Sequence, residues 1–206
     1  HLSPTTAEVF RKAAVKFWKS EKAWDMTTFD GKAEATRNVQ DRTYVKDSLG
    51  LCDFGWPIMD SFHAEDQTGD PTLENRLFSI VTGIDADEAA LNRYGERIFN
   101  LQRAILLREG WDPSEDDAPA AFNFEEPLLF DMLNPELIVP GPTEEPVSVK
   151  GNTLDRGEFE KMRREYYQLR GWDPDTGLQK KEVFERLGMP GVYRELESQN
   201  LVKQAD

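Results

Sequence analysis

The sequence predicts an all-α, multihelical domain. Apolar residues recur at spacings of three and four along most of the chain, and glycine or proline stands where such runs stop. At 206 residues the chain is long enough for one sizeable core. We therefore expect a single helical domain over residues 1–206, with a long Pro-rich loop or arm at about 112–152.

Two helices are expected before residue 50. Ser3 can cap a first helix that has Pro4 at its first position, and the buried face of this helix would contain Ala7, Phe10, Ala14 and Phe17. A second helix is expected over about 31–46. Gly50 then supplies the positive φ that commonly closes a helix.

Two longer helices follow in the middle of the chain. Asp85 and Glu88 have the spacing of a capping box, before a helix that ends at Gly110 and whose apolar stripe contains Leu91, Tyr94, Ile98, Leu101 and Ile105. Asp155 and Glu158 repeat this spacing before a helix that ends at Gly171 and carries Phe159, Met162, Tyr166 and Leu169. Shorter helices are expected near 180–187 and 192–198.

The tetrapeptide Gly-Trp-Asp-Pro occurs twice, at 110–113 and at 171–174. No similarity surrounds the two copies, so we interpret them as helix-end chemistry and not as an internal repeat. The glycine is expected in the left-handed region, and the tryptophan would fold back on the preceding turn. Arg108 and Arg170 would lie at the negative ends of their helices.

The stretch Asp47-Ser48-Leu49-Gly50-Leu51-Cys52 contains the only cysteine of the chain. Taken alone, a single cysteine is most often a small buried hydrophobe. The spacing, however, puts a carboxylate and a thiol on either side of a sharp turn, whose N–H groups could face an anion. Asp47 could accept hydrogen bonds from a polar ring system, and Cys52 as a thiolate could ligate iron.

Several motifs together resemble those of the tungsten-dependent aldehyde:ferredoxin oxidoreductases. The first is Asp-x-x-Gly-Leu-Cys at 47–52, and the others follow in the order of that family over about 31–188. They are the turn Val-Thr-Gly-x-Asp at 81–85, the helix Gly-Glu-Arg-Ile-x-Asn-Leu-x-Arg at 95–103, Arg-Glu-Gly at 108–110, Phe122 with Glu126-Pro127-Leu128, and Glu-Tyr-Tyr-x-Leu-Arg-Gly-Trp-Asp at 165–173.

The resemblance implies a function for the 47–52 stretch. In the family, the equivalents of Asp47 and the Gly50-Leu51 backbone hold a metal-binding pterin, and the equivalent of Cys52 is the last ligand of a [4Fe–4S] cluster. The metal would be tungsten, or less often molybdenum, bound by two pterins. The reaction implied is oxidation of aldehydes to carboxylic acids with ferredoxin as the electron acceptor. The resemblance assigns no catalytic residue.

The chain departs from the family in lacking the upstream Cys-x-x-Cys-x-x-x-Cys run and an earlier Asp-x-x-Gly-Leu motif. We therefore expect a fragment of a larger cytoplasmic oxidoreductase, whose remainder is the N-terminal pterin-binding part. Ferredoxins are commonly acidic, and this chain has a net charge of −14, so ferredoxin is expected to dock on that remainder. A homo-oligomer is compatible with this interpretation.

Two other functions stay open. The altered segment after Cys52, residues 53–60, and the polar stretch 61–70 favour a catalytic subunit of a benzoyl-CoA-type tungsten reductase. A non-enzymatic helical interaction module, in which Cys52 is only core, is the other alternative. The acidity argues against nucleic acid and anionic membranes as partners, and no apolar run approaches the roughly 18 residues of a membrane span.

Three further groups of residues are weak candidates. His63, Glu65 and Asp66 are metal-ligand types, yet a solvated acidic loop is expected, since no second histidine stands at ligand spacing. The run Glu115-Asp116-Asp117 is likewise expected to be a solvated surface loop. The third group lines a substrate channel or belongs to the core, and consists of Phe54, Trp56, Met59 and Phe62.

Overall fold

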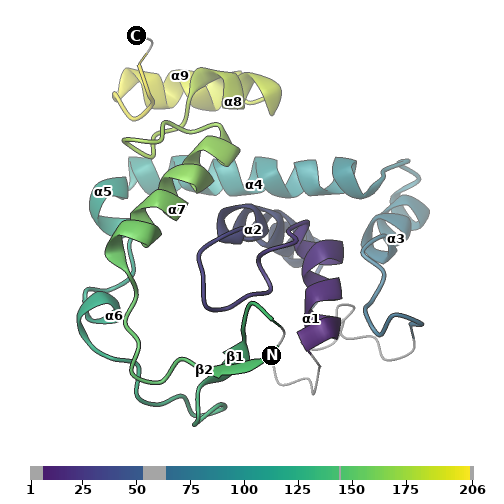
Figure 1. Cartoon of the computed structure of the whole chain (residues 1–206). Helices are drawn as coiled ribbons and strands as arrows, with labels where there is room; N and C mark the ends of the chain where they lie inside the picture. The colour runs from purple at the N-terminus through teal and green to yellow at the C-terminus, as the bar shows by residue number, and fades with distance from the viewer. Residues whose placement is uncertain (1–6, 53–63, 144, 205–206) are drawn as a thin grey trace.

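The fold is that of a multihelical domain, as expected (Figure 1). The computed structural model describes residues 7–52, 64–143 and 145–204. The helices are α1 Ala7–Ala13, the π-helical turn η1 Ala14–Trp18, α2 Lys32–Ser48, α3 Leu73–Thr82, α4 Glu88–Arg108, α5 Pro113–Asp116, α6 Phe122–Glu125, α7 Arg156–Arg170, α8 Lys181–Arg186 and α9 Pro190–Ser198. Within the described residues, no helix is both long and apolar enough to cross a membrane.

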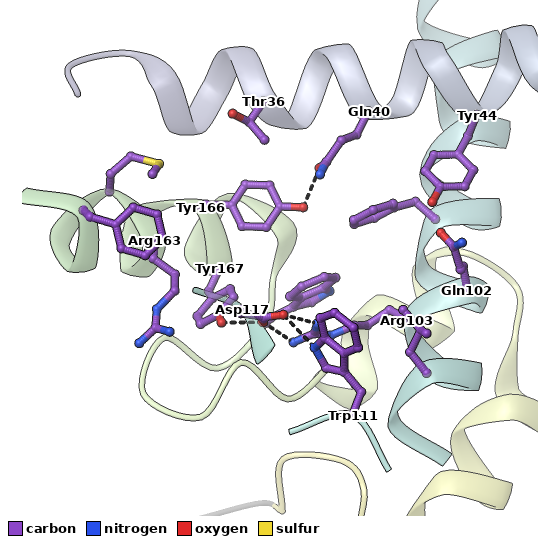
Figure 2. Close-up of a pocket in the computed structure, with 15 residues that line it drawn as sticks. Thr36, Gln40, Tyr44, Gln102, Arg103, Trp111, Asp117, Arg163, Tyr166 and Tyr167 are labelled. Atoms are coloured by element: carbon purple, nitrogen blue, oxygen red, sulfur yellow. Dashed lines mark hydrogen bonds and ion pairs between the residues drawn. The ribbon is translucent and has the colours of Figure 1, made fainter. Parts of the chain in front are cut away.

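Helices α2 and α4 form the centre of the domain, and α7 packs across α2 (Figure 1). The two central helices touch at Gly95, where an added Cβ would lie 1.9 Å from the carbonyl oxygen of Asp41. Only glycine allows this approach. On α7, the Tyr166 hydroxyl donates a hydrogen bond of 2.5 Å to Oε1 of Gln40 on α2 (Figure 2).

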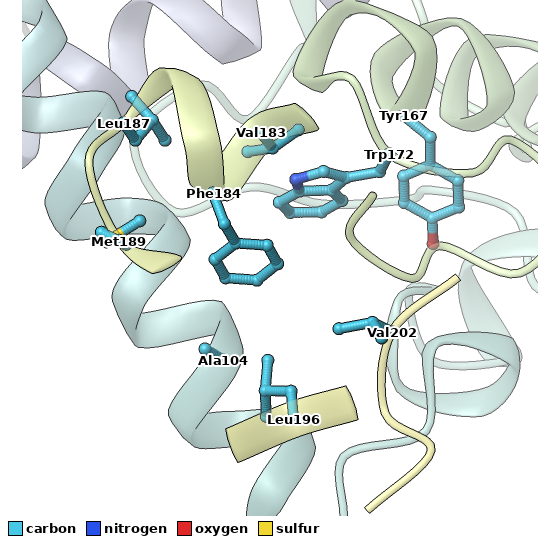
Figure 3. Close-up of a cluster of buried hydrophobic side chains, with 9 residues drawn as sticks. All are labelled: Ala104, Tyr167, Trp172, Val183, Phe184, Leu187, Met189, Leu196 and Val202. Carbon is cyan, nitrogen blue, oxygen red and sulfur yellow. The ribbon is translucent and has the colours of Figure 1, made fainter. Parts of the chain in front are cut away.

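The main core cluster lies between α4, the end of α7 and the C-terminal helices (Figure 3). Trp172 is 2% exposed, and its indole N–H donates to Oδ1 of Asn100 at 2.9 Å. The Gln179 amide donates to the same oxygen at 2.7 Å. The cluster consists of Ala104, Tyr167, Trp172, Val183, Phe184, Leu187, Met189, Leu196 and Val202.

The two Gly-Trp-Asp-Pro segments end helices, as predicted. Gly110 and Gly171 have φ values of 97° and 74°, and the following tryptophan N–H groups donate back to the helices. The second segment does more than end a helix, because Trp172 belongs to the core and Arg170 is completely buried. Its side chain packs between α7 and α2 instead of lying free at the helix end.

The ends of the predicted helices are mostly correct. Ala14 and Phe17 are buried as expected, whereas Ser3 and Pro4 lie outside the described residues. Asp155 caps α7 by accepting a hydrogen bond from the Glu158 N–H at 2.8 Å. The cap predicted for α4 was wrong. Asp87, not Asp85, accepts the N–H of Ala90 at 2.7 Å.

The apolar stripe predicted for α4 is largely exposed. Leu91 is buried, but Tyr94, Leu101 and Ile105 are 45%, 40% and 45% exposed. The helix uses two other faces for packing, and the residues buried there are Leu91, Gly95, Asn100, Arg103, Ala104 and Leu107. The periodicity therefore predicted the helix correctly and its buried face wrongly. On α7 the predicted stripe is only partly buried, and Tyr167 and Arg170 are the buried residues.

The Pro-rich segment has more structure than a loop. Strands β1 Ile138–Pro140 and β2 Pro146–Ser148 pair antiparallel, with Val139 opposite Val147. The short helices α5 and α6 precede this hairpin, which lies apart from α4 (Figure 1). Helix α3, which contains the start of the 81–85 motif, was not anticipated from periodicity.

Candidate functional site

The turn that closes α2 contains all the predicted cofactor residues. Gly50 has a φ of 70°, as expected for a helix-closing glycine. Its N–H donates to the carbonyl of Asp47 at 3.1 Å, and the Leu51 N–H donates to the carbonyl of Lys46 at 2.9 Å. This is the hydrogen-bond pattern of a Schellman cap. The expectation that these N–H groups face an anion was therefore wrong, because the cap uses them.

The outer side of this turn is open to solvent. Asp47, Gly50 and Cys52 are exposed, and Leu51 is partly buried. A Cβ added at Gly50 would meet no atom within 4 Å. A flat group could therefore approach the backbone of the turn closely at Gly50. Cys52 is exposed, which contradicts the alternative in which it is only core.

The inner side of the turn is held by buried charges. Lys46 is 1% exposed, and burial, followed by the nearby Arg42, lowers the pKa of its ammonium group. Arg42 donates two hydrogen bonds to Glu74 on α3, at 3.1 Å from Nε and 2.7 Å from Nη2. The Glu74 side chain is 4% exposed. This ion pair joins the C-terminal half of α2 to α3, about one to two helical turns before the turn at 47–52.

The donor set of the turn fits one corner of an iron–sulfur cluster. A [4Fe–4S] cluster is held by four thiolates, and this chain contains one cysteine. In the described part of the chain, no three His, Cys, Asp or Glu side chains come together as a metal site. The open turn is therefore suited to a group shared with another polypeptide segment, and not to a metal that this chain alone would enclose.

The other predicted metal-ligand types do not form a site within the described residues. The Asp66 carboxylate accepts a 2.9 Å hydrogen bond from Lys16 and further bonds from Thr68, and these lower its pKa. It joins the loop to η1. His63 lies outside the described residues, as do Phe54, Trp56, Met59 and Phe62.

A second feature is a cavity of about 360 Å³ between α2, α4 and α7 (Figure 2). Seven of its fifteen lining residues are aromatic, and Tyr44 is the lining residue of α2 nearest in sequence to the turn at 47–52. None of the predicted cofactor residues lines it. The lining residues are Thr36, Gln40, Tyr44, Phe99, Gln102, Arg103, Leu106, Trp111, Asp117, Phe159, Met162, Arg163, Tyr166, Tyr167 and Trp172.

Asp117 lines this cavity, which corrects the prediction of a solvated loop for that residue, whereas Glu115 and Asp116 are exposed as expected. Its carboxylate accepts hydrogen bonds from Arg103 Nη1 at 2.7 Å, Trp111 Nε1 at 2.8 Å and the Tyr167 hydroxyl at 2.5 Å. Burial alone would raise the pKa of Asp117, but the bonds from Arg103 and Tyr167 outweigh burial and lower it. An acid held in this way has little capacity to act as a base.

Burial and the bond to Asp117 raise the pKa of Tyr167 well above its ordinary range. The sequence did not predict the contacts of Asp117 with Arg103 and Tyr167, because these two residues are 14 and 50 positions away from it in the chain. Within the acidic run 115–117, nothing in the sequence indicated that Asp117 would be partly buried and Glu115 exposed.

The comparisons with known proteins agree with the fold. The family model described as aldehyde ferredoxin oxidoreductase, domains 2 and 3, matches residues 1–189. The chain therefore belongs to the aldehyde ferredoxin oxidoreductase family, a class of redox enzymes.

Particular relatives show how much of a complete enzyme the match covers. A tungsten-containing aldehyde ferredoxin oxidoreductase of Pyrococcus furiosus is 32% identical over 164 residues, which are 80% of this chain and 22% of the relative. The WOR-like subunit of an aliphatic sulfonate oxidoreductase of the same organism is 35% identical over 113 residues, 53% of this chain and 15% of that protein. The chain thus spans about a fifth of the length of these relatives or less.

One solved structure shares the fold. It is the BamBC active-site complex of benzoyl-coenzyme A reductase with 1,5-dienoyl-CoA. The TM-score is 0.57 with 20% sequence identity, and the match covers 87% of this chain and 22% of the other chain.

Proposed function

We propose that this chain is a single helical domain of a tungsten-pterin, [4Fe–4S] oxidoreductase that oxidises aldehydes to carboxylic acids with ferredoxin as electron acceptor. The observation that carries the proposal is the position of Asp47, Gly50, Leu51 and Cys52 on one exposed turn at the end of α2. The names of relatives at 32% identity, tungsten-containing aldehyde ferredoxin oxidoreductases, support it.

In this proposal Cys52 supplies one thiolate of the cluster. Its exposure leaves the sulfur accessible to a group that the rest of the enzyme also holds. The remaining three thiolates come from the other part of the enzyme, because this chain contains no further cysteine. Ferredoxin docks on that part, because a net charge of −14 on this chain would repel an acidic ferredoxin.

Asp47 and the turn backbone hold the pterin as hydrogen-bond acceptors. The N–H groups of Gly50 and Leu51 already donate within the helix cap. The backbone contact therefore falls to carbonyl oxygens, beside the Asp47 carboxylate. A pterin ring presents amino and ring N–H donors, so an acceptor-rich turn matches it. When bound, the metal–pterin takes up the electrons of the substrate and the cluster passes them on singly.

In this proposal, the chain's own contribution is to position the two cofactors. The Schellman cap sets the path of the chain from Asp47 to Leu51, and the Arg42–Glu74 ion pair joins α2 to α3. A cluster ligand and a pterin contact on one turn keep the two cofactors adjacent. We assign no catalytic residue, and we propose a cytoplasmic location and leave a homo-oligomer open.

The test is cofactor analysis of the complete protein, purified without oxygen. Tungsten, pterin and about four irons per polypeptide are expected, together with oxidation of aldehydes by the complete protein. A soluble, folded and iron-free protein would instead support the helical interaction module.

The alternative enzymatic function is a benzoyl-CoA-type tungsten reductase. The sequence of residues 53–60, which lie outside the described residues, motivates it. Assays with aldehydes and with an aromatic acyl-CoA on the same cofactor-loaded preparation distinguish the two. Turnover of the acyl-CoA without aldehyde oxidation would favour the reductase.

A further inference from the structure

Helix α4 has an apolar face that the described part of the chain leaves largely exposed. Tyr94, Leu101 and Ile105 are 45%, 40% and 45% exposed, and Ile98 between them is partly buried. Their spacing of four, three and four residues puts them on one side of the helix. We call these four residues the α4 stripe.

The other faces of α4 are already used. One face packs on α2, where Gly95 touches the backbone of Asp41. Another faces the C-terminal helices, where Ala104 belongs to the core cluster (Figure 3). The buried residues of α4 include the polar Asn100 and Arg103, while the apolar Leu101 and Ile105 stay exposed. A helix normally turns its apolar face inward, so the composition of α4 indicates that the α4 stripe is covered in the complete enzyme.

The end of α3 carries further exposed apolar side chains. The rings of Phe78 and Tyr94 lie 6.0 Å apart, which places α3 beside the first part of the α4 stripe. Two and three residues after Phe78, Ile80 and Val81 are 81% and 74% exposed. Two neighbouring helices therefore each expose large apolar side chains, and exposed apolar surface of this kind is typical of an interaction site.

The charge along α4 indicates what kind of surface would fit. Arg93 and Arg97 are exposed on the helix that carries the stripe. Neither makes an ion pair with a described residue, although the chain has a net charge of −14. A second copy of this face would bring the same arginines and no carboxylate from the stripe. A surface that is apolar and bordered by carboxylates is a better match.

We propose that the α4 stripe is the docking face for the remainder of a larger oxidoreductase of this family. The matched region is 22% of the length of the Pyrococcus furiosus relative, so about four-fifths of such an enzyme lies outside it. The proposal rests on family membership and not on the roles assigned to Asp47 and Cys52. It adds a second contact surface to the cofactor turn.

The test places a photo-crosslinking amino acid at Leu101 in the complete, purified enzyme. The matched control is Val39 on α2, because the two side chains are almost equally exposed, 40% and 41%. We expect the probe at Leu101, and not at Val39, to link to peptides outside residues 1–206. A link to a second copy of residues 1–206, no link from Leu101, or an enzyme with no polypeptide beyond these residues would overturn the proposal.

A second experiment uses the double substitution Leu101→Glu with Ile105→Glu, compared with Val39→Glu. We expect the double variant to expose peptides of the remainder, with amide hydrogen exchange roughly tenfold faster there, equivalent to about 1.4 kcal/mol. Equal exchange in all three proteins would contradict the proposal. Both experiments are repeated on metal-free enzyme, so their result is independent of whether the proposed cofactors are correct.

Discussion

The guanidinium of Arg170 donates a hydrogen bond of 2.5 Å to the carboxylate of Asp41, 129 residues earlier in the chain. Arg170 is fully buried and also donates to the carbonyl of Arg37 at 3.1 Å. The last residue of α7 is therefore fixed to the middle of α2, the helix that ends at the turn proposed to bind the cofactors. Burial raises the pKa of Asp41, while Arg170 opposes this effect.

Replacing Arg170 with Met should destabilise the domain strongly. Removing one partner of a buried ion pair leaves the other charge uncompensated, which typically costs about 3–5 kcal/mol. The measurement is the free energy of unfolding by denaturant. The control is Arg164→Met, on the same helix, where the arginine side chain is 50% exposed. Equal decreases in the free energy of unfolding of the two variants would show that the buried ion pair contributes no more to stability than the exposed one.

Gly95→Ala should also destabilise the domain, because the added methyl group would overlap the carbonyl oxygen of Asp41. Overpacking of this kind costs roughly 1–3 kcal/mol. Gly191→Ala in α9 is the control, since an added Cβ there meets nothing within 4 Å. That variant should be neutral or more stable, as alanine favours a helix over glycine. Thermal unfolding of both variants checks the pair, and an unaffected Gly95→Ala protein would contradict the close approach of the helices.

Asp117→Asn should lower stability at neutral pH by about 3 kcal/mol, because Arg103 would lose its buried carboxylate. The pKa of Asp117 is lowered in the folded protein. Its contribution is therefore complete above the unfolded pKa of about 3.9 and is lost as pH falls through the folded pKa.

The measurement is unfolding free energy against pH for the wild type, Asp117→Asn and the exposed control Glu115→Gln. The difference between the wild type and Asp117→Asn should shrink below about pH 4. A difference that stays constant down to pH 2 would show that the charge of Asp117 does not carry the effect.

Cys52→Ala in the complete enzyme should leave the fold intact and remove one cluster ligand. The side chain is exposed, and exposed substitutions usually change stability by no more than about 0.5 kcal/mol. We expect a labile or three-iron cluster, measured as iron content and by EPR, with electron transfer impaired. Unchanged iron and an unchanged EPR spectrum would exclude Cys52 as a ligand.

Asp47→Asn in the complete enzyme should reduce pterin retention while the helices persist. The change keeps the size of the side chain but removes charge-assisted hydrogen bonds, each worth about 1.5–3 kcal/mol. Tungsten and pterin contents are compared with those of Glu34→Gln, near the other end of α2. Full cofactor occupancy with lowered thermal stability would mean that Asp47 is structural.

The sequence by itself determined the helical class, most helix ends and the turn at Gly50. These depend on local chemistry: glycine adopts positive φ, aspartate caps a helix start, and apolar spacing marks a helix. Capping failed once, at Asp85, because Asp87 is also a capping type and lies two residues later. The motif that includes Asp47 and Cys52 was equally visible, since its residues are close in sequence.

Only the tertiary structure decided which faces are buried and which distant residues meet. The stripe of α4 is exposed because Gly95 directs another face toward α2, and no local pattern encodes that choice. Asp117 becomes a partly buried acceptor because Tyr167, 50 residues later, packs beside it. Such contacts depend on how complete helices pack, so the spacing of residues within one helix cannot reveal them.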